Sequence, residues 1–216
     1  MTLALASITR REVVLTVDGR STKRNGGNIT FNDAYVKIIP VPGSRLAVYH
    51  HGQNTFGGAD WKDLVEPLLD ELADKTRTTA QARVLLDKKL DSVVRKQLNS
   101  MEIGKQAGFV AIGFGASDKE PSAWEILWRR TSDGVSVERT STLPVGVVTS
   151  GDGGDLIPAR GWKDIDGKSV DQIRDMQRNL IEQAKSKQPS TSNSVGGHTH
   201  EIVIDKFVQW TIPPLP

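Results

Sequence analysis

The second residue of the chain is a threonine, and its position gives a common side chain unusual chemical options. If Met1 is removed, Thr2 carries a free α-amine and a hydroxyl on adjacent carbons. A threonine hydroxyl is a poor nucleophile until a base accepts its proton, and an α-amine with a pKa near ~8 can act as that base. Thr2 is therefore a candidate N-terminal nucleophile that carries its own base. Threonine is also common at this position, so position alone leaves an ordinary structural role open.

The predicted strands indicate what could hold Thr2 in place. Apolar runs at residues 3–8 and 13–17 have strand length and are joined by a polar step, which is typical of a hairpin. A second strand pair is expected at 35–41 and 45–49, around Pro42-Gly43. Further strands are expected at residues 108–115, 123–130 and 135–139, with one or two more across 201–212.

Helices are expected in three places. Residues 61–72 have helical spacing of apolar side chains, although Pro67 should kink this helix or delay its start. Capping boxes formed by Thr78 with Gln81 and by Ser169 with Gln172 predict the starts of two more. The order of strands, two helices, strands, helix and strands favours an α+β fold with mainly antiparallel sheets. Because the strands are apolar with little polar alternation, we expect both faces of each sheet to be covered.

The composition is that of one globular domain, so residues 1–216 are expected to form a single unit with a proline-rich tail from about residue 213. Hydrophobic residues make up 37% and charged residues 25% of the chain, which excludes a disordered or membrane protein. A formal charge of +2 without a dense basic stripe argues against nucleic-acid binding. The absence of cysteine excludes disulfides and thiolate metal sites, and favours a cytoplasmic protein.

Cofactor signals are weak. His198 and His200 lie on one face of a predicted strand and could form half of a metal site, but spacing fixes no third ligand near them. The glycine-rich segments GFGAS and GDGGD lack the endings of a phosphate-binding loop or a dinucleotide fingerprint. We therefore expect neither a metal nor a cofactor.

When Thr2 is counted as the first residue of the mature chain, several residues lie at the distances along the sequence that a known protein family shows. They are Asp18 and Thr22 in VDGRST, Lys37 in YVKII with a three-residue slip, Gly52 in YHHGQN, and Ser150-Gly151 in VVTSGDGG. With these residues the sequence resembles the proteasome β-subunit family of N-terminal-nucleophile (Ntn) hydrolases. The resemblance is greatest to its bacterial branch, which includes HslV and the bacterial proteasome homologue (BPH) group.

The resemblance implies a threonine-type endopeptidase site. Thr2 would be the nucleophile, and Lys37 would lower the pKa of its amine and hydroxyl while Asp18 keeps the lysine charged. Gly52 would donate its backbone N–H to the oxyanion, and Ser150 would lie beside the nucleophile. The further residues expected to line the substrate site are Thr22, Tyr49 and Gly151. Tyr49 begins a bulky Tyr-His-His run, which indicates either a narrowed first pocket or a plain strand end.

The resemblance also implies a fold and an assembly. The fold would be a four-layer αββα sandwich of the Ntn-hydrolase type. The protein would be a bacterial, cytoplasmic homo-oligomer of stacked hexameric or heptameric rings that cleaves peptides or unfolded proteins. An ATP-dependent unfoldase would be its partner, although no motif in the chain encodes one.

Two departures from the family pattern keep other functions open. Where the family carries an aspartate and then a serine before paired glycines, this chain has Ser192 and Val195 before Gly196-Gly197, and Asp152 is the nearest substitute. The chain could therefore be a catalytically weak or inactive shell or peptide-binding oligomer. A third alternative, an Ntn amidase for a small amide, needs no enclosed chamber and would favour a monomer or dimer.

Overall fold

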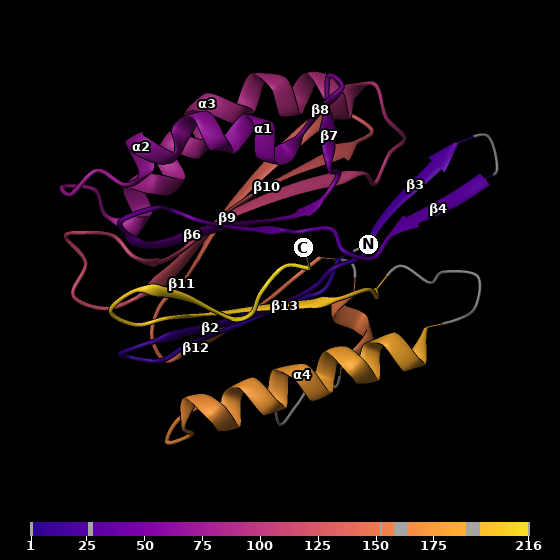
Figure 1. Ribbon diagram of the computed structural model, residues 1–216. Coiled ribbons are helices and arrows are strands. Elements are labelled where there is room, and N and C mark those ends of the chain that lie inside the picture. The colour runs from indigo at the N-terminus through magenta and orange to yellow at the C-terminus, as the bar shows by residue number, and fades with distance from the viewer. Residues whose placement is uncertain (1, 26–27, 152, 158–163, 189–194, 216) are drawn as a thin grey trace.

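Two stacked antiparallel sheets form the centre of the protein, in a computed structural model that describes residues 2–25, 28–151, 153–157, 164–188 and 195–215 (Figure 1). Sheet I has the strand order β12-β1-β2-β13-β14. All of its strand pairs are antiparallel. Its strands are β1 (Ala4–Ile8), β2 (Val13–Asp18), β12 (Gly146–Ser150), β13 (Thr199–Ile204) and β14 (Val208–Ile212).

Sheet II has the strand order β11-β10-β9-β6-β5 and is also antiparallel throughout. Its strands are β5 (Ile38–Pro40), β6 (Arg45–Gly52), β9 (Gln106–Phe114), β10 (Ser122–Thr131) and β11 (Gly134–Thr142). Two small hairpins complete the β structure: β3 (Ser21–Asn25) with β4 (Asn28–Asn32), and β7 (Thr55–Phe56) with β8 (Ala59–Asp60). The β3–β4 hairpin projects beyond the ends of both sheets (Figure 1).

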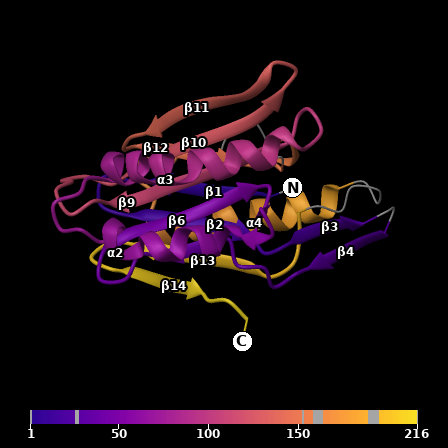
Figure 2. The same ribbon diagram turned by 90° about the horizontal axis from the view of Figure 1, so that it is seen from above.

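Helices lie on the outer faces of the two sheets. α1 (Trp61–Val65), the 3₁₀ turn η1 (Glu66–Leu68), α2 (Leu69–Leu72) and α3 (Thr79–Asn99) cover sheet II, as the view from above shows (Figure 2). α4 (Val170–Lys187) packs against sheet I, next to the short turn η2 (Gly154–Leu156). None of the helices in the described part of the chain has the length and apolar character needed to cross a membrane.

Strand alternation divides the core into layers. In β1, Ala4, Ala6 and Ile8 belong to the core between the sheets, whereas Leu3 and Leu5 pack beneath α4. Both faces of such strands are buried, which explains why the sequence shows apolar runs without polar alternation. The same alternation places Thr2 on the side that faces sheet II.

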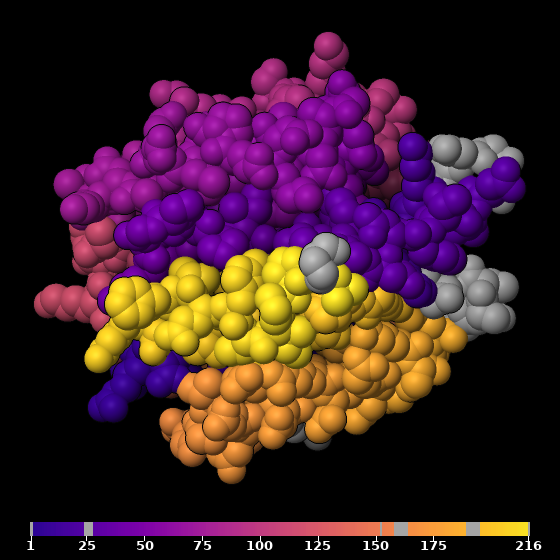
Figure 3. Space-filling view, in the orientation of Figure 1, coloured from indigo at the N-terminus to yellow at the C-terminus, as the bar shows by residue number. Residues whose placement is uncertain are grey.

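The expected four-layer αββα sandwich is wrong. The protein is mostly β-sheet, with 40% of its residues in strands and 27% in helices, and the strands form several antiparallel sheets. Five strands spaced ~4.8 Å apart make a sheet roughly 20 Å wide, whereas one helix is about 10 Å across. α4 is the one long helix that the described residues place against sheet I, so this side has no complete helical layer. Figure 3 shows the β13–β14 hairpin at the surface beside α4.

Predictions of helix boundaries from local chemistry are confirmed. Thr78 and Ser169 each cap a helix in a complete capping box with Gln81 and Gln172, respectively. Pro67 interrupts the first helical segment, which passes through η1 before the short α2 begins.

Two predictions of strands need correction. The strand expected at 35–41 shrinks to β5, because Pro40 and Pro42 have no N–H to donate to a neighbouring strand. No strand is predicted between residues 17 and 35, where the structure has the β3–β4 hairpin. In β4 the apolar residues Ile29 and Phe31 alternate with polar ones, but all five side chains are exposed, so this alternation does not mark a core face.

Gln177 joins α4 to sheet I through buried polar contacts. Its amide donates to Ser7 Oγ at 2.9 Å and accepts from Thr16 Oγ1 at 2.7 Å. All three side chains are fully buried. Ser7 depends on this amide for a hydrogen bond that water cannot supply, while Thr16 Oγ1 also lies 3.3 Å from Glu201 Oε2, so the contact helps to fix where α4 docks.

We expect Gln177→Leu to lower the free energy of unfolding by ~1–3 kcal/mol, because Ser7 and Thr16 lose their amide partner inside the core. Urea denaturation followed by circular dichroism measures the change. Gln183→Leu makes the same substitution at an exposed position of α4 and should change the free energy little. Equal losses in the two variants would contradict a role for the buried contact.

Candidate active site

A buried ion pair connects the two sheets next to the start of the chain. Lys37 directly precedes β5 of sheet II, and Asp18 ends β2 of sheet I. Lys37 Nζ lies 2.8 Å from Asp18 Oδ1, and both side chains are 0% exposed. The two charges meet because the strands that carry them are stacked, not because they are close in sequence.

Asp18 also holds the backbone around the candidate nucleophile. Its Oδ1 accepts the N–H of Leu3 at 2.8 Å, and its own N–H donates to the Leu3 carbonyl at 3.0 Å. Its Oδ2 accepts the N–H of Gly196 at 3.1 Å. The residue after Thr2 is thus fixed by the same carboxylate that pairs with Lys37.

The environment changes the acidity of Lys37. Burial lowers the pKa of its ammonium from the ordinary value, and the charge and hydrogen bond of Asp18 oppose that shift. A buried ammonium with one carboxylate partner has donors to spare. It can stabilise negative charge that develops on a neighbouring oxygen.

Thr2 is almost completely buried at the end of β1, with an exposed fraction of 2%. Its carbonyl accepts the N–H of Gly153 at 3.1 Å. Gly151 has a φ of +87°, and a Cβ there would lie only 3.1 Å from the Thr2 Cβ. The Ser150-Gly151 segment therefore packs directly against Thr2, in a conformation and at a distance that suit glycine.

Ser150 and Tyr49 meet between the sheets. The Tyr49 hydroxyl lies 2.9 Å from Ser150 Oγ, and both side chains are buried. Tyr49 belongs to the apolar core between the sheets. Burial and the charge of Glu125 raise the pKa of the Tyr49 phenol, so this group keeps its proton.

Gly52 and Thr22 are not joined to Thr2 by any contact among the described residues. Gly52 ends β6 with a φ of +89°, and a Cβ there would overlap the carbonyl of Gln106, so a larger residue does not fit. Thr22 lies on the projecting β3–β4 hairpin, opposite Phe31. Its hydroxyl is buried without a hydrogen-bond partner in the part of the chain that the structure describes.

Sequence reasoning missed the carboxylate that lies next to Ser150. Glu125 of β10 accepts a hydrogen bond from His51 Nε2 at 2.7 Å, and the two side chains are 20% and 2% exposed, respectively. A charged residue inside the apolar strand AWEILW was the available signal. Its partner is 74 positions away, so the pairing could not be found from the sequence.

The segment with the departures from the family pattern is only partly described. Asp152 and Ser192 lie outside the described residues. Val195 is buried, and the side chain of Gln188 bonds its backbone N–H and carbonyl. It offers no hydroxyl toward the candidate site.

The histidine pair does not form a metal centre in the described residues, which hold no cluster of three or more suitable ligands. His198 Nε2 contacts the carbonyl of Pro213 at 2.8 Å. His200 is fully buried, and neither of its ring nitrogens has a hydrogen-bond partner among the described residues. Burial lowers the pKa of His200 to about 4, and the charges of His198 and Lys37 act in the same direction while Asp18 opposes them.

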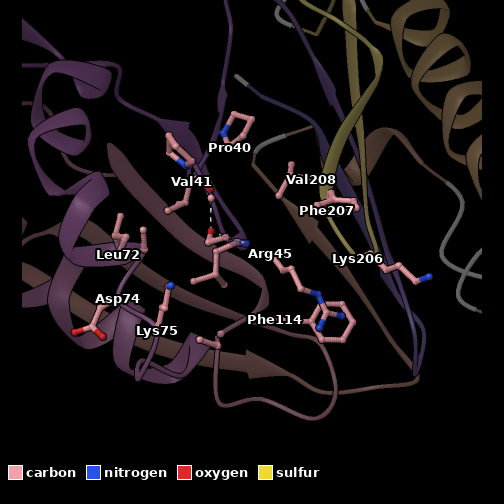
Figure 4. A pocket seen from close by; sticks show the side chains of 17 residues that line it. Pro40, Val41, Arg45, Leu72, Asp74, Lys75, Phe114, Lys206, Phe207 and Val208 are labelled. Atoms are coloured by element: carbon pink, nitrogen blue, oxygen red, sulfur yellow. Dashed lines mark hydrogen bonds between the residues drawn. The ribbon is translucent and has the colours of Figure 1, made fainter.

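A cavity of about 490 Å³ lies at the other end of the sheets, where β6 begins and β13 ends (Figure 4). Its walls include Pro40, Leu72 and Phe207, and the Arg45 guanidinium lies 3.6 Å from the centre of the Phe114 ring. The residues expected to be catalytic or substrate-binding do not line this cavity. It is therefore separate from the candidate active site.

Comparison with known proteins gives a likeness in fold alone. No family model matches the sequence, and no curated protein matches it either. The structure is similar to a solved structure of Anbu, a Gly-1 mutant from Hyphomicrobium sp. strain MC1. The TM-score is 0.58 and the sequence identity 12%, over 98% of this chain and 85% of that chain.

This comparison corrects the expected placement with HslV and the BPH group. The solved structure reported above is an Anbu protein and not a member of either of those groups, so the expected placement is wrong, and the likeness shows a shared fold. The placement rested on a few residues such as Asp18 and Lys37 and needed a three-residue slip. At 12% identity so few positions cannot distinguish branches that share a fold.

We expect Lys37→Met to lower the free energy of unfolding by about 3–5 kcal/mol, because it leaves the Asp18 carboxylate buried without its counter-ion. Urea denaturation measures this loss. The double variant Lys37→Met/Asp18→Asn should recover part of the stability, since no unpaired charge remains. A single variant as stable as the double variant would show that the pair is not energetically coupled.

A second prediction concerns acid stability. The unfolded chain binds a proton at His200 with a pKa near ~6.5, whereas the folded protein does so only near about 4. Between these values the unfolded state binds more protons, so stability falls as the pH falls. His200→Leu removes this titration and breaks no hydrogen bond among the described residues. The free energy of unfolding should then change less steeply with pH, by up to ~1.4 kcal/mol per pH unit. Unfolding measured from pH 4 to 7 tests this, and parallel curves for variant and wild type would contradict it.

Proposed function

We propose that the protein is a threonine-type endopeptidase that uses Thr2 as an N-terminal nucleophile after removal of Met1. The observation that carries this proposal is the buried Asp18–Lys37 pair, bonded to the backbone of the residue that follows Thr2. A buried ion pair contributes little net stability compared with apolar packing, so its placement against the backbone of Leu3 needs another reason. Perturbed ionisable groups cluster at functional sites.

The proposed reaction begins with proton transfer from the Thr2 hydroxyl to the Thr2 α-amine, directly or through one water. The resulting oxygen nucleophile attacks the carbonyl carbon of the peptide bond, and the Lys37 ammonium stabilises the negative charge on the attacking oxygen. The backbone N–H of Gly52 is the proposed donor to the oxyanion, a contribution of roughly 3 kcal/mol per donor in other hydrolases.

The proposed intermediate then collapses to an ester. The carbon–nitrogen bond breaks, the leaving amine takes the proton from the α-amine of Thr2, and the acyl group remains on the threonine oxygen. Water, deprotonated by the same α-amine, attacks the ester and releases the acid, which regenerates Thr2. Ser150 and Gly151 are proposed to border the nucleophile, with Thr22 and Tyr49 on the substrate side.

The proposed substrates are peptides or unfolded proteins, and the proposed assembly is a homo-oligomer of stacked hexameric or heptameric rings. The fold likeness to a proteasome-like protein supports both. An ATP-dependent unfoldase would then be the partner that delivers substrates.

A non-catalytic role is the second candidate, favoured by the burial of Thr2. With an exposed fraction of 2%, its hydroxyl is not open to a substrate in the described structure. Val195 also stands where a hydroxyl would be expected from the resemblance. In this case the chain would serve as a shell or peptide-binding oligomer without turnover.

Intact-mass spectrometry before and after treatment with a peptide epoxyketone separates the two candidates. The Thr2 hydroxyl adds to the ketone and the α-amine opens the epoxide, so no atoms are lost and the protein gains the full mass of the reagent. We expect loss of Met1 and a single adduct in the wild type. Thr2→Ser should keep the adduct and Thr2→Ala should abolish it. Retained Met1, or a processed chain that never reacts, would rule out the peptidase.

A further inference from the structure

Four polar side chains face one another between the sheets, at the end where Thr2 lies. Tyr49 points into the core between the sheets, and His51, two residues later on β6, shares its face. On β10, Glu125 shares the face of Ala123, which belongs to the same core. Ser150 of sheet I closes the group from the opposite side through its contact with Tyr49.

Hydrogen bonds connect these side chains into one network. Glu125 accepts from His51 Nε2 at 2.7 Å on one oxygen and from Thr140 Oγ1 at 3.2 Å on the other. The Ser150 side chain lies within reach of the Glu125 carboxylate and helps to lower its pKa. Tyr49 reaches the same serine at 2.9 Å. A carboxylate and an imidazole are thus one serine away from the candidate nucleophile.

The fold accommodates Glu125 and His51 but gains little stability from them. The His51 ring lies flat against Gly108, where a Cβ would overlap its atoms. A glycine inside β9 weakens a strand, and a polar pair between the sheets rarely stabilises more than apolar side chains of the same size. The proposed reaction also assigns no task to Glu125 or His51. The pair therefore lacks both a structural and a catalytic explanation so far.

The direction of each hydrogen bond follows from the protonation of the groups. Burial raises the pKa of Glu125. The hydrogen bond and charge of His51, together with the neighbouring hydroxyls of Thr140 and Ser150, outweigh burial and hold the Glu125 pKa below its ordinary value. The carboxylate is therefore ionised and can only accept. An acceptor-only carboxylate near Ser150 favours a serine O–H that points to Glu125, and the Tyr49 phenol is then the donor in its 2.9 Å contact with Ser150 Oγ.

Ser150 keeps one free lone pair in this arrangement, since a hydroxyl oxygen has two acceptor sites and Tyr49 occupies one. Ser150 pairs with Ala4 across sheet I, so Thr2 is its diagonal neighbour on the same face. The remaining lone pair is therefore available to an N–H of Thr2.

We infer that Glu125 and His51 are a positioning pair for the nucleophile and act through Ser150. Ser150 Oγ accepts one N–H of the Thr2 α-amine, which turns the amine lone pair toward the Thr2 hydroxyl. Glu125 keeps the serine proton away from the amine, and His51 holds Glu125 in place. The inference rests on the proposed function of Thr2, and neither residue makes or breaks a covalent bond.

The test uses the full chain with Met1 removed and the peptide epoxyketone, and follows adduct formation by intact mass at several reagent concentrations. Glu125→Gln should lower the maximal rate of adduct formation about tenfold, the effect of losing one hydrogen bond to a charged group, and leave the half-saturating concentration unchanged. Glu138→Gln, an exposed position on β11, should react like the wild type. A wild-type rate for Glu125→Gln would overturn the inference and leave the proposed function intact.

A double-mutant cycle tests the path through Ser150. If Glu125 acts only through this serine, Ser150→Ala/Glu125→Gln should react no more slowly than Ser150→Ala alone. A purely structural role of Glu125 would make the two losses multiply, and that result would overturn the inference. A wild-type protein that never forms the adduct would overturn both the inference and the proposed function.

Two substitutions of His51 decide the question if Glu125→Gln does not fold. His51→Gln keeps an N–H that can donate to Glu125, whereas His51→Leu removes it. We expect His51→Gln to restore most of the maximal rate and His51→Leu to lose about as much as Glu125→Gln. Equal rates in these two variants, with both shown to be folded by thermal unfolding, would exclude a positioning role for His51.

Discussion

The arrangement of this protein depends on one buried ion pair between its two sheets. Asp18 and Lys37 come from different sheets, lie 2.8 Å apart and are completely removed from water. Each charge is costly to bury alone, so the sheets must stack in the register that brings them together. Because Asp18 also bonds the backbone of Leu3, this register fixes the start of the chain. The position of Thr2 thus follows from the packing of the sheets.

The space between the sheets holds two kinds of contact. Over most of its length it is an apolar core, but at the Thr2 end it carries the ion pair and the polar group of Tyr49, His51, Glu125 and Ser150. The large cavity lies at the opposite end and shares none of these residues. Polar groups buried where the strands end, next to a threonine, are better explained by chemistry than by stability.

Residues with local signals were predicted well. Both capping boxes, the break at Pro67 and most strands depend on interactions within a few positions, so the sequence contains what is needed to find them. The αββα arrangement failed because periodicity identifies a helix but not the area of sheet that it covers, and α4 is too narrow to cover sheet I. The finer family placement failed because it rested on few positions.

The sequence by itself determined which residues could do chemistry near the start of the chain, and it named Thr2, Asp18 and Lys37 as a set. Side-chain type and position singled out Thr2, and the resemblance to a known family supplied Asp18 and Lys37. Only the tertiary structure decided that Glu125 and His51 join Ser150, and that Tyr49 lies in the core. Those contacts join strands far apart in the chain, and strand alternation decides which face each residue takes only once the sheets are stacked.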